Sequence, residues 1–191
     1  MSLFKTAIAN SIAVKQQLLQ EPTLLHDLEA VGELWVRTLR RGGKLLFCGN
    51  GGSAADAQHL AAELSGRFYL ERPPLYAEAL HVNGSYLTAV GNDYGYAESY
   101  ARMVRAAGRK DDVLVAISTS GNSENILRAA RAARAIGMHT VGLTGAGGGA
   151  LAPLCDYLLA VPSKDTPRIQ EAHILLGHCL CQYTEAALFG E

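Results

Sequence analysis

The sequence predicts an α/β fold, a three-layer sandwich in which helices cover both faces of a doubly wound, five-stranded parallel sheet. Three segments share one design: an apolar run, a loop of small polar residues, and then a helix-like pattern. They are KLLFCGNGGSAADAQHL, DVLVAISTSGNSENILRAA and HTVGLTGAGGGALAPL. Short continuous apolar runs are typical of strands buried on both faces, and their alternation with helices is typical of a parallel sheet. Two further runs, LYAEALHV and CDYLLAVP, supply the remaining strands.

Extra helices are expected at both ends of this sandwich. Two precede the sheet, over 2–19 and 23–40, because the ring of Pro22 interrupts a continuous helix. A stripe typical of a packing helix runs along the first of them, through Phe4, Ile8, Ile12 and Leu19. A long helix over 167–188 closes the chain, with Pro167 suited to its first turn. Since these helices carry more apolar surface than one sheet can cover, we expect a homo-oligomer.

Length and charge limit the function classes. The 191 residues fit one domain, 1–191, made of N-terminal packing helices (1–41) and the sandwich with its C-terminal helix (42–191). The net charge of −1 provides no broad cationic surface, so neither a nucleic acid nor an anionic membrane is an expected partner. Polar residues interrupt MSLFKTAIANSIAVKQQ, so we expect no signal peptide or spanning helix and a cytoplasmic protein.

The cysteines give no sign of a metal or redox motif. They form no CxxC pair and have no zinc-ribbon spacing, so we expect reduced core thiols at Cys48, Cys155, Cys179 and Cys181.

The strongest local signal is the segment 118–123, STSGNS, which lies between the second apolar run and a helix. Free backbone N–H groups and the helix dipole attract an anion at a helix N-terminus, and four hydroxyl groups add donors there. The segment therefore predicts a cup for a phosphate monoester. The alternative is an ordinary helix cap, which Ser123 or Asn122 could supply alone.

A nucleotide site is not indicated. GNGGSA lacks the G-x-G-x-x-G spacing, and no Gly-Lys-Ser/Thr follows any glycine run. The run 145–149 has no lysine or hydroxyl cluster, so it predicts only a tight, flexible connection between a strand and a helix.

The helix that follows GNGG presents Asp56, His59 and Glu63 on one face. A histidine and a glutamate one turn apart can bind a metal jointly or act as acid and base on one substrate. The alternative is a solvated stripe in which Glu63 pairs with Arg67.

Two polar residues, Gln170 and His178, interrupt the otherwise apolar C-terminal helix. Their eight-residue separation corresponds to about 12 Å of helix rise, which is awkward for a shared metal ion. His173 is closer to Gln170, but it falls with Ile169 and Leu176 and is expected to be a buried core histidine. Elsewhere, AVGNDYGY predicts a turn at Asn92 and Asp93 that could present polar groups to a sugar, or simply a turn.

Together, GNGGSAADAQH, LTAVGNDYGY, RKDDVLVAISTSGNS and PRIQEAHILLGH resemble the sugar isomerase (SIS) domain proteins, and within them the sedoheptulose 7-phosphate isomerases. The likeness implies a substrate site at Asn50, Gly51, Gly52, Ser53, Glu63, Asn92, Asp93, Ser118, Thr119, Ser120, Ser123 and Gln170. It implies one zinc ion (Zn2+) per subunit on His59, Glu63, Gln170 and His178, with Glu63 and His178 as the catalytic pair. It also implies a homotetramer with sites at subunit contacts. Some relatives carry an acid where this chain has Pro167, and no role is assigned to that position.

The resemblance implies conversion of sedoheptulose 7-phosphate to D-glycero-D-manno-heptose 7-phosphate, which supplies heptose for lipopolysaccharide or surface glycans. One alternative is a non-catalytic SIS module of the replication-initiator-associating type, but the resemblance there includes loss of the terminal-helix histidine, which is present here as His178. Another alternative is a different sugar-phosphate isomerase, or a regulatory protein that binds a sugar phosphate. The cup cannot distinguish these, because it would contact only the phosphate group that all such ligands share. Sugar length would then depend on loops such as 83–96.

Overall fold

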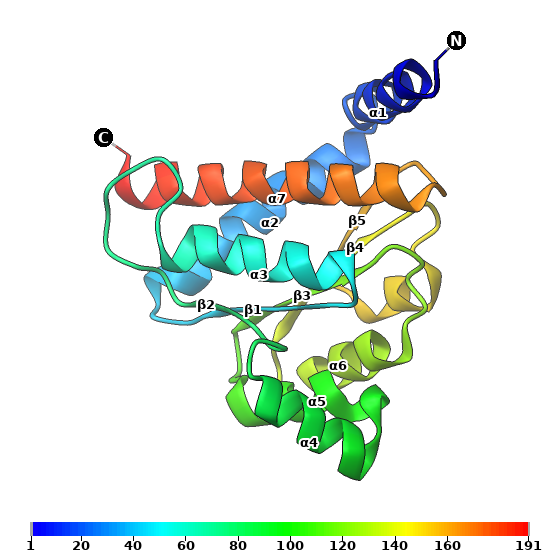
Figure 1. Ribbon diagram of the computed structural model, residues 1–191. Coiled ribbons are helices and arrows are strands. Elements are labelled where there is room, and N and C mark those ends of the chain that lie inside the picture. Colours follow the sequence, from blue (N-terminus) through cyan, green and yellow to red (C-terminus); the bar gives the residue numbers. More distant parts are fainter. Residues whose placement is uncertain (1, 191) are drawn as a thin grey trace.

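The computed structural model describes residues 2–190 and confirms the predicted sandwich (Figure 1). Its five strands are all parallel and lie in the order β2-β1-β3-β4-β5. Their bounds are β1 Leu45–Gly49, β2 Ala77–Ala79, β3 Val113–Ser118, β4 His139–Thr144 and β5 Tyr157–Ala160. In register, Leu45 pairs with Val113, which pairs with His139. Every residue of β1 and β3 is buried, which explains their continuous apolar runs.

Helices cover both faces of the sheet. One face carries α2 (Pro22–Arg40), α3 (Gly52–Ser65) and α7 (Thr166–Phe189); the other carries α4 (Gly84–Tyr94), α5 (Ser99–Ala107) and α6 (Glu124–Ala135) (Figure 1). Two short three-ten helices, η1 (Tyr96–Glu98) and η2 (Gly149–Leu154), complete the second layer. The segment 83–96, expected to be a loop, is therefore mostly helix. The pattern after 145–149, expected to be an α-helix, is the three-ten helix η2.

The first helix, α1 (Leu3–Leu18), extends away from the body of the chain (Figure 1). Its apolar stripe does not pack on this chain: Phe4 is 77 % exposed, Ile8 62 % and Ile12 52 %. The break between α1 and α2 lies where the sequence predicts it, but Pro22 is the first residue of α2 and does not precede it. Proline is well suited to that position because its missing N–H has no partner there in any helix.

Helices α3 and α7 run side by side in the same direction, and this arrangement positions the candidate site (Figure 1). Two glycines allow the close approach. A Cβ atom at Gly177 would lie 2.5 Å from the side chain of Leu60, and one at Gly52 would lie 2.3 Å from Nε2 of Gln170. The pairing of position 52 with 170 and of 60 with 177 fixes the parallel register.

All four cysteines are free, but they do not share one environment. Cys48 and Cys181 are buried core thiols as predicted, whereas Cys155 is partly buried and Cys179 is exposed. Burial raises the pKa of the Cys181 thiol to about 12. Among residues 2–190, no helix is both long enough and apolar enough to cross a membrane.

Candidate active site

The carboxyl ends of the strands gather the small-residue loops at one edge of the sheet, as a parallel sheet requires. A cavity of about 200 Å³ lies there. It is lined by Asn50, Ser53, Ile117, Ser118, Thr119, Ser123, Thr166 and Gln170. Cup residues and Gln170 therefore line one cavity, although the lining comes from the loop after β1, from α3, from the end of β3 with its following loop, and from α7.

The predicted phosphate cup lies between the end of β3 and the start of α6. The Oγ atoms of Ser118 and Ser123 are 3.2 Å apart. Ser123 occupies the cap position of α6, yet its side chain makes no cap hydrogen bond. The simple capping role is therefore not what Ser123 performs here, and its hydroxyl is held beside Ser118. Ser120 is exposed, and its Oγ accepts a hydrogen bond from the Asn122 N–H at 3.2 Å.

The backbone of the glycine run 145–149 packs against the loop that forms the cup. A Cβ atom at Gly121, whose φ is +66°, would lie 2.0 Å from the carbonyl oxygen of Gly148. Only glycine permits so close a contact in that conformation. The predicted tight connection is thus also the backbone against which the cup loop rests.

A polar network that no sequence pattern predicted holds Asn50. The amides of Asn50 and Asn125 exchange two hydrogen bonds, both 2.9 Å long. The Tyr96 hydroxyl donates to Oδ1 of Asn50 at 2.8 Å. Asn125 is buried in the first turn of α6, directly after the cup. Its polar side chain on the inward, otherwise apolar face of the amphipathic helix α6 was the signal that could have identified it.

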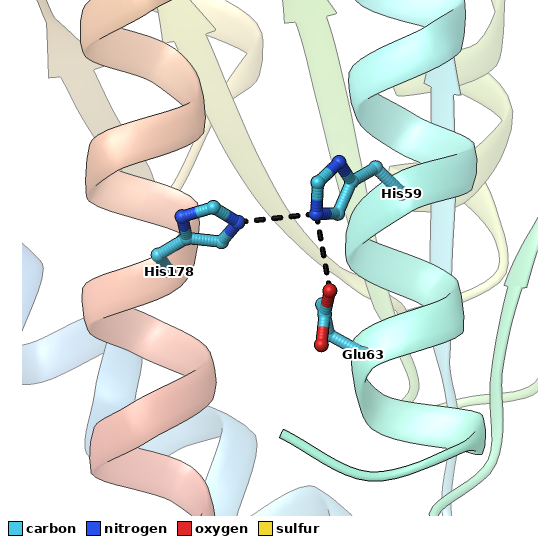
Figure 2. A group of neighbouring side chains, drawn as sticks. All are labelled: His59, Glu63 and His178. Atoms are coloured by element: carbon cyan, nitrogen blue, oxygen red, sulfur yellow. Dashed lines mark hydrogen bonds and ion pairs between the residues drawn. The ribbon is translucent and has the colours of Figure 1, made fainter. Parts of the chain in front are cut away.

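Three side chains from α3 and α7 meet in one group, which we call the His-Glu-His cluster: His59, Glu63 and His178 (Figure 2). The Nε2 atoms of His59 and His178 are 3.2 Å apart, and Nε2 of His59 lies 3.1 Å from Oε1 of Glu63. Glu63 therefore faces His59, and the alternative partner Arg67 contacts Glu71 instead.

The spacing of the cluster fits a metal ion. Its three ligand atoms lie within 4.8 Å of one another. Two nitrogens bound to a tetrahedral zinc ion at about 2.0–2.1 Å stand about 3.3 Å apart, close to the observed separations. Two imidazoles and a carboxylate are also a common ligand set for zinc. The arrangement can hold a divalent cation, and it can also move protons between a carboxylate and an imidazole.

Gln170 is a residue of α7 that lies beside Gly52, at the N-terminal end of α3. It lines the cavity together with the cup residues. Gly52 precedes His59 by seven residues, or about 10 Å of helix rise. The structure therefore brings Gln170 to the cup, and a helix segment separates it from the His-Glu-His cluster.

His173 is a core residue, as its apolar neighbours predict. Its side chain is fully buried, and Nε2 lies 3.0 Å from the carbonyl oxygen of Thr144. Burial lowers the pKa of His173 to about 4, against the opposing effect of that hydrogen bond. The ring is therefore neutral at pH 7 and donates its Nε2 proton to Thr144.

Asn92 and Asp93 do not form the predicted turn. Both are in the last turns of α4 and are exposed, and Nδ2 of Asn92 donates to Oδ1 of Asp93 at 2.8 Å. The helix continues to Tyr94, and Gly95, with φ of +82°, ends it. Among residues 2–190, the side-chain hydrogen bond of these two residues is the one they make with each other, whereas Tyr96 links the following three-ten helix to Asn50.

Asp56 lies one turn before His59 on α3. It is partly buried, and among the described residues its Oδ2 atom has no hydrogen-bond partner. Burial raises the pKa of Asp56, and nearby His59 acts in the opposite direction.

Comparisons with known proteins identify the family of this chain. The SIS domain family model matches residues 9–145. A phosphoheptose isomerase of Mycobacterium tuberculosis is 51 % identical over 179 residues, which cover 94 % of this chain and 91 % of the relative. One from Rhodospirillum rubrum is 59 % identical over 160 residues, covering 84 % and 85 %.

A solved structure gives the same result. The phosphoheptose isomerase of Neisseria gonorrhoeae superposes with a TM-score of 0.90 at 46 % identity, covering 96 % of this chain and 97 % of its own. Fold and sequence thus define the class, that of the SIS domain proteins. Within it, the chain belongs to the phosphoheptose isomerase family.

Proposed function

We propose that this protein isomerises sedoheptulose 7-phosphate to D-glycero-D-manno-heptose 7-phosphate, as a step in making heptose for lipopolysaccharide or surface glycans. The observation that carries the proposal is the meeting of His59, Glu63 and His178 from two helices, about 9 Å along α3 from the cup. The cup suits the phosphate end of the substrate and the cluster suits its reacting carbon atoms. Membership of the phosphoheptose isomerase family supports the same reaction.

The two ends of the site have a separation suited to a long sugar. Ser53 lines the cup cavity and His59 belongs to the cluster. His59 follows Ser53 by six positions on α3, which correspond to about 9 Å of helix rise. In the proposal, Ser118, Ser120 and Ser123 hold the phosphate, with Thr119 beside them. Substrate contacts with Asn50, Gly51, Gly52, Ser53, Asn92, Asp93 and Gln170 are also proposed.

Glu63 and His178 would carry the protons. The reaction removes a proton from C1 and returns it to C2, while another proton moves from O1 to O2. Glu63 takes and returns the carbon-bound proton. Because its Oε1 faces His59, Oε2 is the oxygen assigned to that step. His178 carries the proton between the two substrate oxygens, through the ring nitrogen that does not hold the metal ion.

A zinc ion is part of the proposal. His59, Glu63 and His178 would hold it, with Gln170 as a fourth ligand that has to move from its place beside Gly52. The ion would supply positive charge near the two substrate oxygens, where the negative charge of an enediolate develops.

We also propose a homotetramer. The support is the apolar face of α1, where Ile8 is 62 % exposed and Ile12 52 % exposed. Burying such side chains in a subunit contact removes apolar area from water. Changing Ile8 and Ile12 together to serine should lower the molar mass measured by light scattering, whereas Lys5→Ser on the same helix should not.

One assay tests the activity. Metal content and turnover of sedoheptulose 7-phosphate and fructose 6-phosphate are measured for wild type, Glu63→Gln and His178→Asn. We expect bound zinc, preference for the heptulose and loss of turnover in both variants. A wild-type protein that binds the sugar phosphate but converts neither sugar is instead a non-catalytic SIS module.

A further inference from the structure

A buried ion pair lies beyond the His-Glu-His cluster and belongs to neither the cup nor the cluster. Nε of Arg72 is 3.0 Å from Oε1 of Glu185, and the two side chains are only 1 % and 2 % exposed. Arg72 follows the end of α3, and Glu185 is near the end of α7. Burying two charges is costly unless further hydrogen bonds satisfy both groups, so those bonds reveal what the pair does.

The carboxylate of Glu185 binds the backbone of the segment after α3 and holds it against α7. Its Oε1 accepts the N–H of Phe68 at 3.0 Å, and its Oε2 accepts those of Tyr69 at 2.6 Å and Leu70 at 2.9 Å. With Arg72 this makes four hydrogen bonds to one carboxylate. As a result, the ring of Phe68 lies 5.6 Å from the ring of His178.

The guanidinium of Arg72 holds the end of α3 itself. It donates from Nη2 to the carbonyl oxygen of Glu63 at 2.9 Å and from Nη1 to that of Leu64 at 2.7 Å. The last carbonyl groups of a helix have no partner within the helix, and here an arginine supplies one. Nη1 also donates to the carbonyl oxygens of Gly66 and Pro73. The backbone of a cluster residue is thus bonded directly to this ion pair.

The pair therefore ties together the two helices that form the cluster. Glu185 follows His178 by seven residues, about two turns, so both are on the same side of α7. We propose that Arg72 and Glu185 are positioning residues, which fix the end of α3 against α7 and so set the geometry between Glu63 and His178. Their catalytic relevance rests on the proposed function, whereas their effect on the cluster geometry does not.

The charge state of Glu185 agrees with this role. Burial acts to raise its pKa, but the hydrogen bonds from Leu70, Tyr69, Phe68 and Arg72 outweigh burial and hold the pKa below its usual range. The carboxylate is therefore ionised at neutral pH and keeps all four bonds.

A second ion pair provides a matched control. Nζ of Lys44 lies 2.6 Å from Oδ2 of Asp112, with side chains 14 % and 4 % exposed. Asp112 also accepts the backbone N–H groups of Lys44 and Arg109. This pair is next to the amino ends of β1 and β3, at the edge of the sheet opposite the cup. Asp112→Asn therefore removes the same kind of buried charge as Glu185→Gln, but far from the cluster.

The experiment uses the full chain and two measurements of the cluster. The first is the affinity for Co²⁺. The second is the nuclear Overhauser effect between the rings of His59 and His178 in metal-free protein. We expect Glu185→Gln and Arg72→Lys to weaken Co²⁺ binding by about 10- to 100-fold, as loss of support for a metal ligand usually does. The ring contact should weaken as well, whereas binding of inorganic phosphate at the cup should not change. Asp112→Asn should lower stability and leave the Co²⁺ affinity and the ring contact unchanged.

Arg72→Lys keeps the positive charge but cannot reach all the carbonyl groups, so it remains informative if Glu185→Gln does not fold. The proposal is overturned if the folded variants retain the wild-type Co²⁺ affinity and ring contact. If wild type turns over no sugar, the proposed function fails, but the ring contact still decides the positioning role. If wild type is active, the variants should lower kcat far more than they raise KM.

Discussion

The Nε2 atoms of His59 and His178 lie 3.2 Å apart, although 119 positions separate the two residues in the sequence. They face each other because α3 and α7 run in parallel and because Gly177 lets α7 approach Leu60. Two imidazole nitrogens at this distance either share one hydrogen bond or bind one ion.

Removing either histidine should abolish metal binding. His59→Asn and His178→Asn should each lower zinc affinity by more than the roughly 10- to 100-fold that loss of an outer hydrogen-bond partner costs, because a direct ligand is lost. Isothermal titration of metal-free protein measures this. His26, an exposed residue of α2, is the control, and His26→Asn should bind zinc as wild type does. Full zinc affinity in His178→Asn would contradict the site.

The cup hydroxyls should contribute to phosphate binding and contribute little to the stability of α6. Because Ser123 makes no cap hydrogen bond, Ser123→Ala should change the free energy of unfolding by less than about 0.5 kcal/mol. Binding of the substrate phosphate should weaken about tenfold or more, since a hydrogen bond to a charged group is lost. Titration with inorganic phosphate and urea unfolding test the two effects separately.

A true cap provides the comparison for the cup. The Asn83 side chain accepts the N–H of Tyr86 at the start of α4, so Asn83→Ala should cost about 1 kcal/mol of stability. It should leave phosphate affinity unchanged. Equal losses of stability in Ser123→Ala and Asn83→Ala would show that Ser123 is only a cap.

Two glycines near the site should respond differently to alanine. A Cβ atom at Gly49 would lie 2.3 Å from the backbone oxygen of Ser53, so Gly49→Ala should destabilise by about 1–3 kcal/mol. At Gly52 the obstacle is only the flexible end of Gln170, so stability should change by less than about 1 kcal/mol. Gly52→Ala should instead displace the Gln170 amide and raise KM.

Gly84 is the matched control for Gly52. Both residues begin a helix, but a Cβ atom at Gly84 meets nothing within 4 Å. Gly84→Ala should therefore leave both KM and folding close to those of wild type. A wild-type KM in Gly52→Ala would remove Gln170 from the substrate site.

His173 should make stability depend on pH. Its folded pKa of about 4 is below the ordinary value, so below about pH 6.5 the unfolded chain binds a proton that the folded chain does not. The contribution is fully present above pH 6.5 and is lost as the pH falls toward 4, by up to about 1.4 kcal/mol per pH unit. His173→Gln should flatten this slope in urea unfolding at pH 5 and 7, whereas the exposed His26→Gln should not.

Local patterns were sufficient for the sheet. The runs at β1 and β3 are apolar throughout because both faces of each strand are covered, and burial of this kind leaves a clear mark in the sequence. The edge strands β2 (77–79) and β5 (157–160) are shorter than the apolar runs that predicted them. Each pairs on one side only, so the flanking residues have no second neighbour that would extend the strand.

Local patterns failed at Asn92 and Asp93. Asparagine and glycine in GNDYGY favour a turn, but the cap at Asn83 starts a helix that continues to Tyr94. The residue that actually reaches Asn50 from this region is Tyr96. Its role could not be predicted because the hydrogen bond depends on how η1 lies against the loop after β1.

Local sequence patterns were enough to predict the strands, most of the helices, the serine-rich loop at a helix start and the placing of His59 and Glu63 one turn apart, because each depends on neighbours in the chain. The tertiary contacts were needed to place the rings of His59 and His178 3.2 Å apart and to place Gln170 by Gly52 at the cup. These distances depend on the register of α3 against α7. That register is set by the absence of a side chain at Gly177 and by contacts such as the one between Arg72 and Glu185, which are 113 positions apart in the sequence.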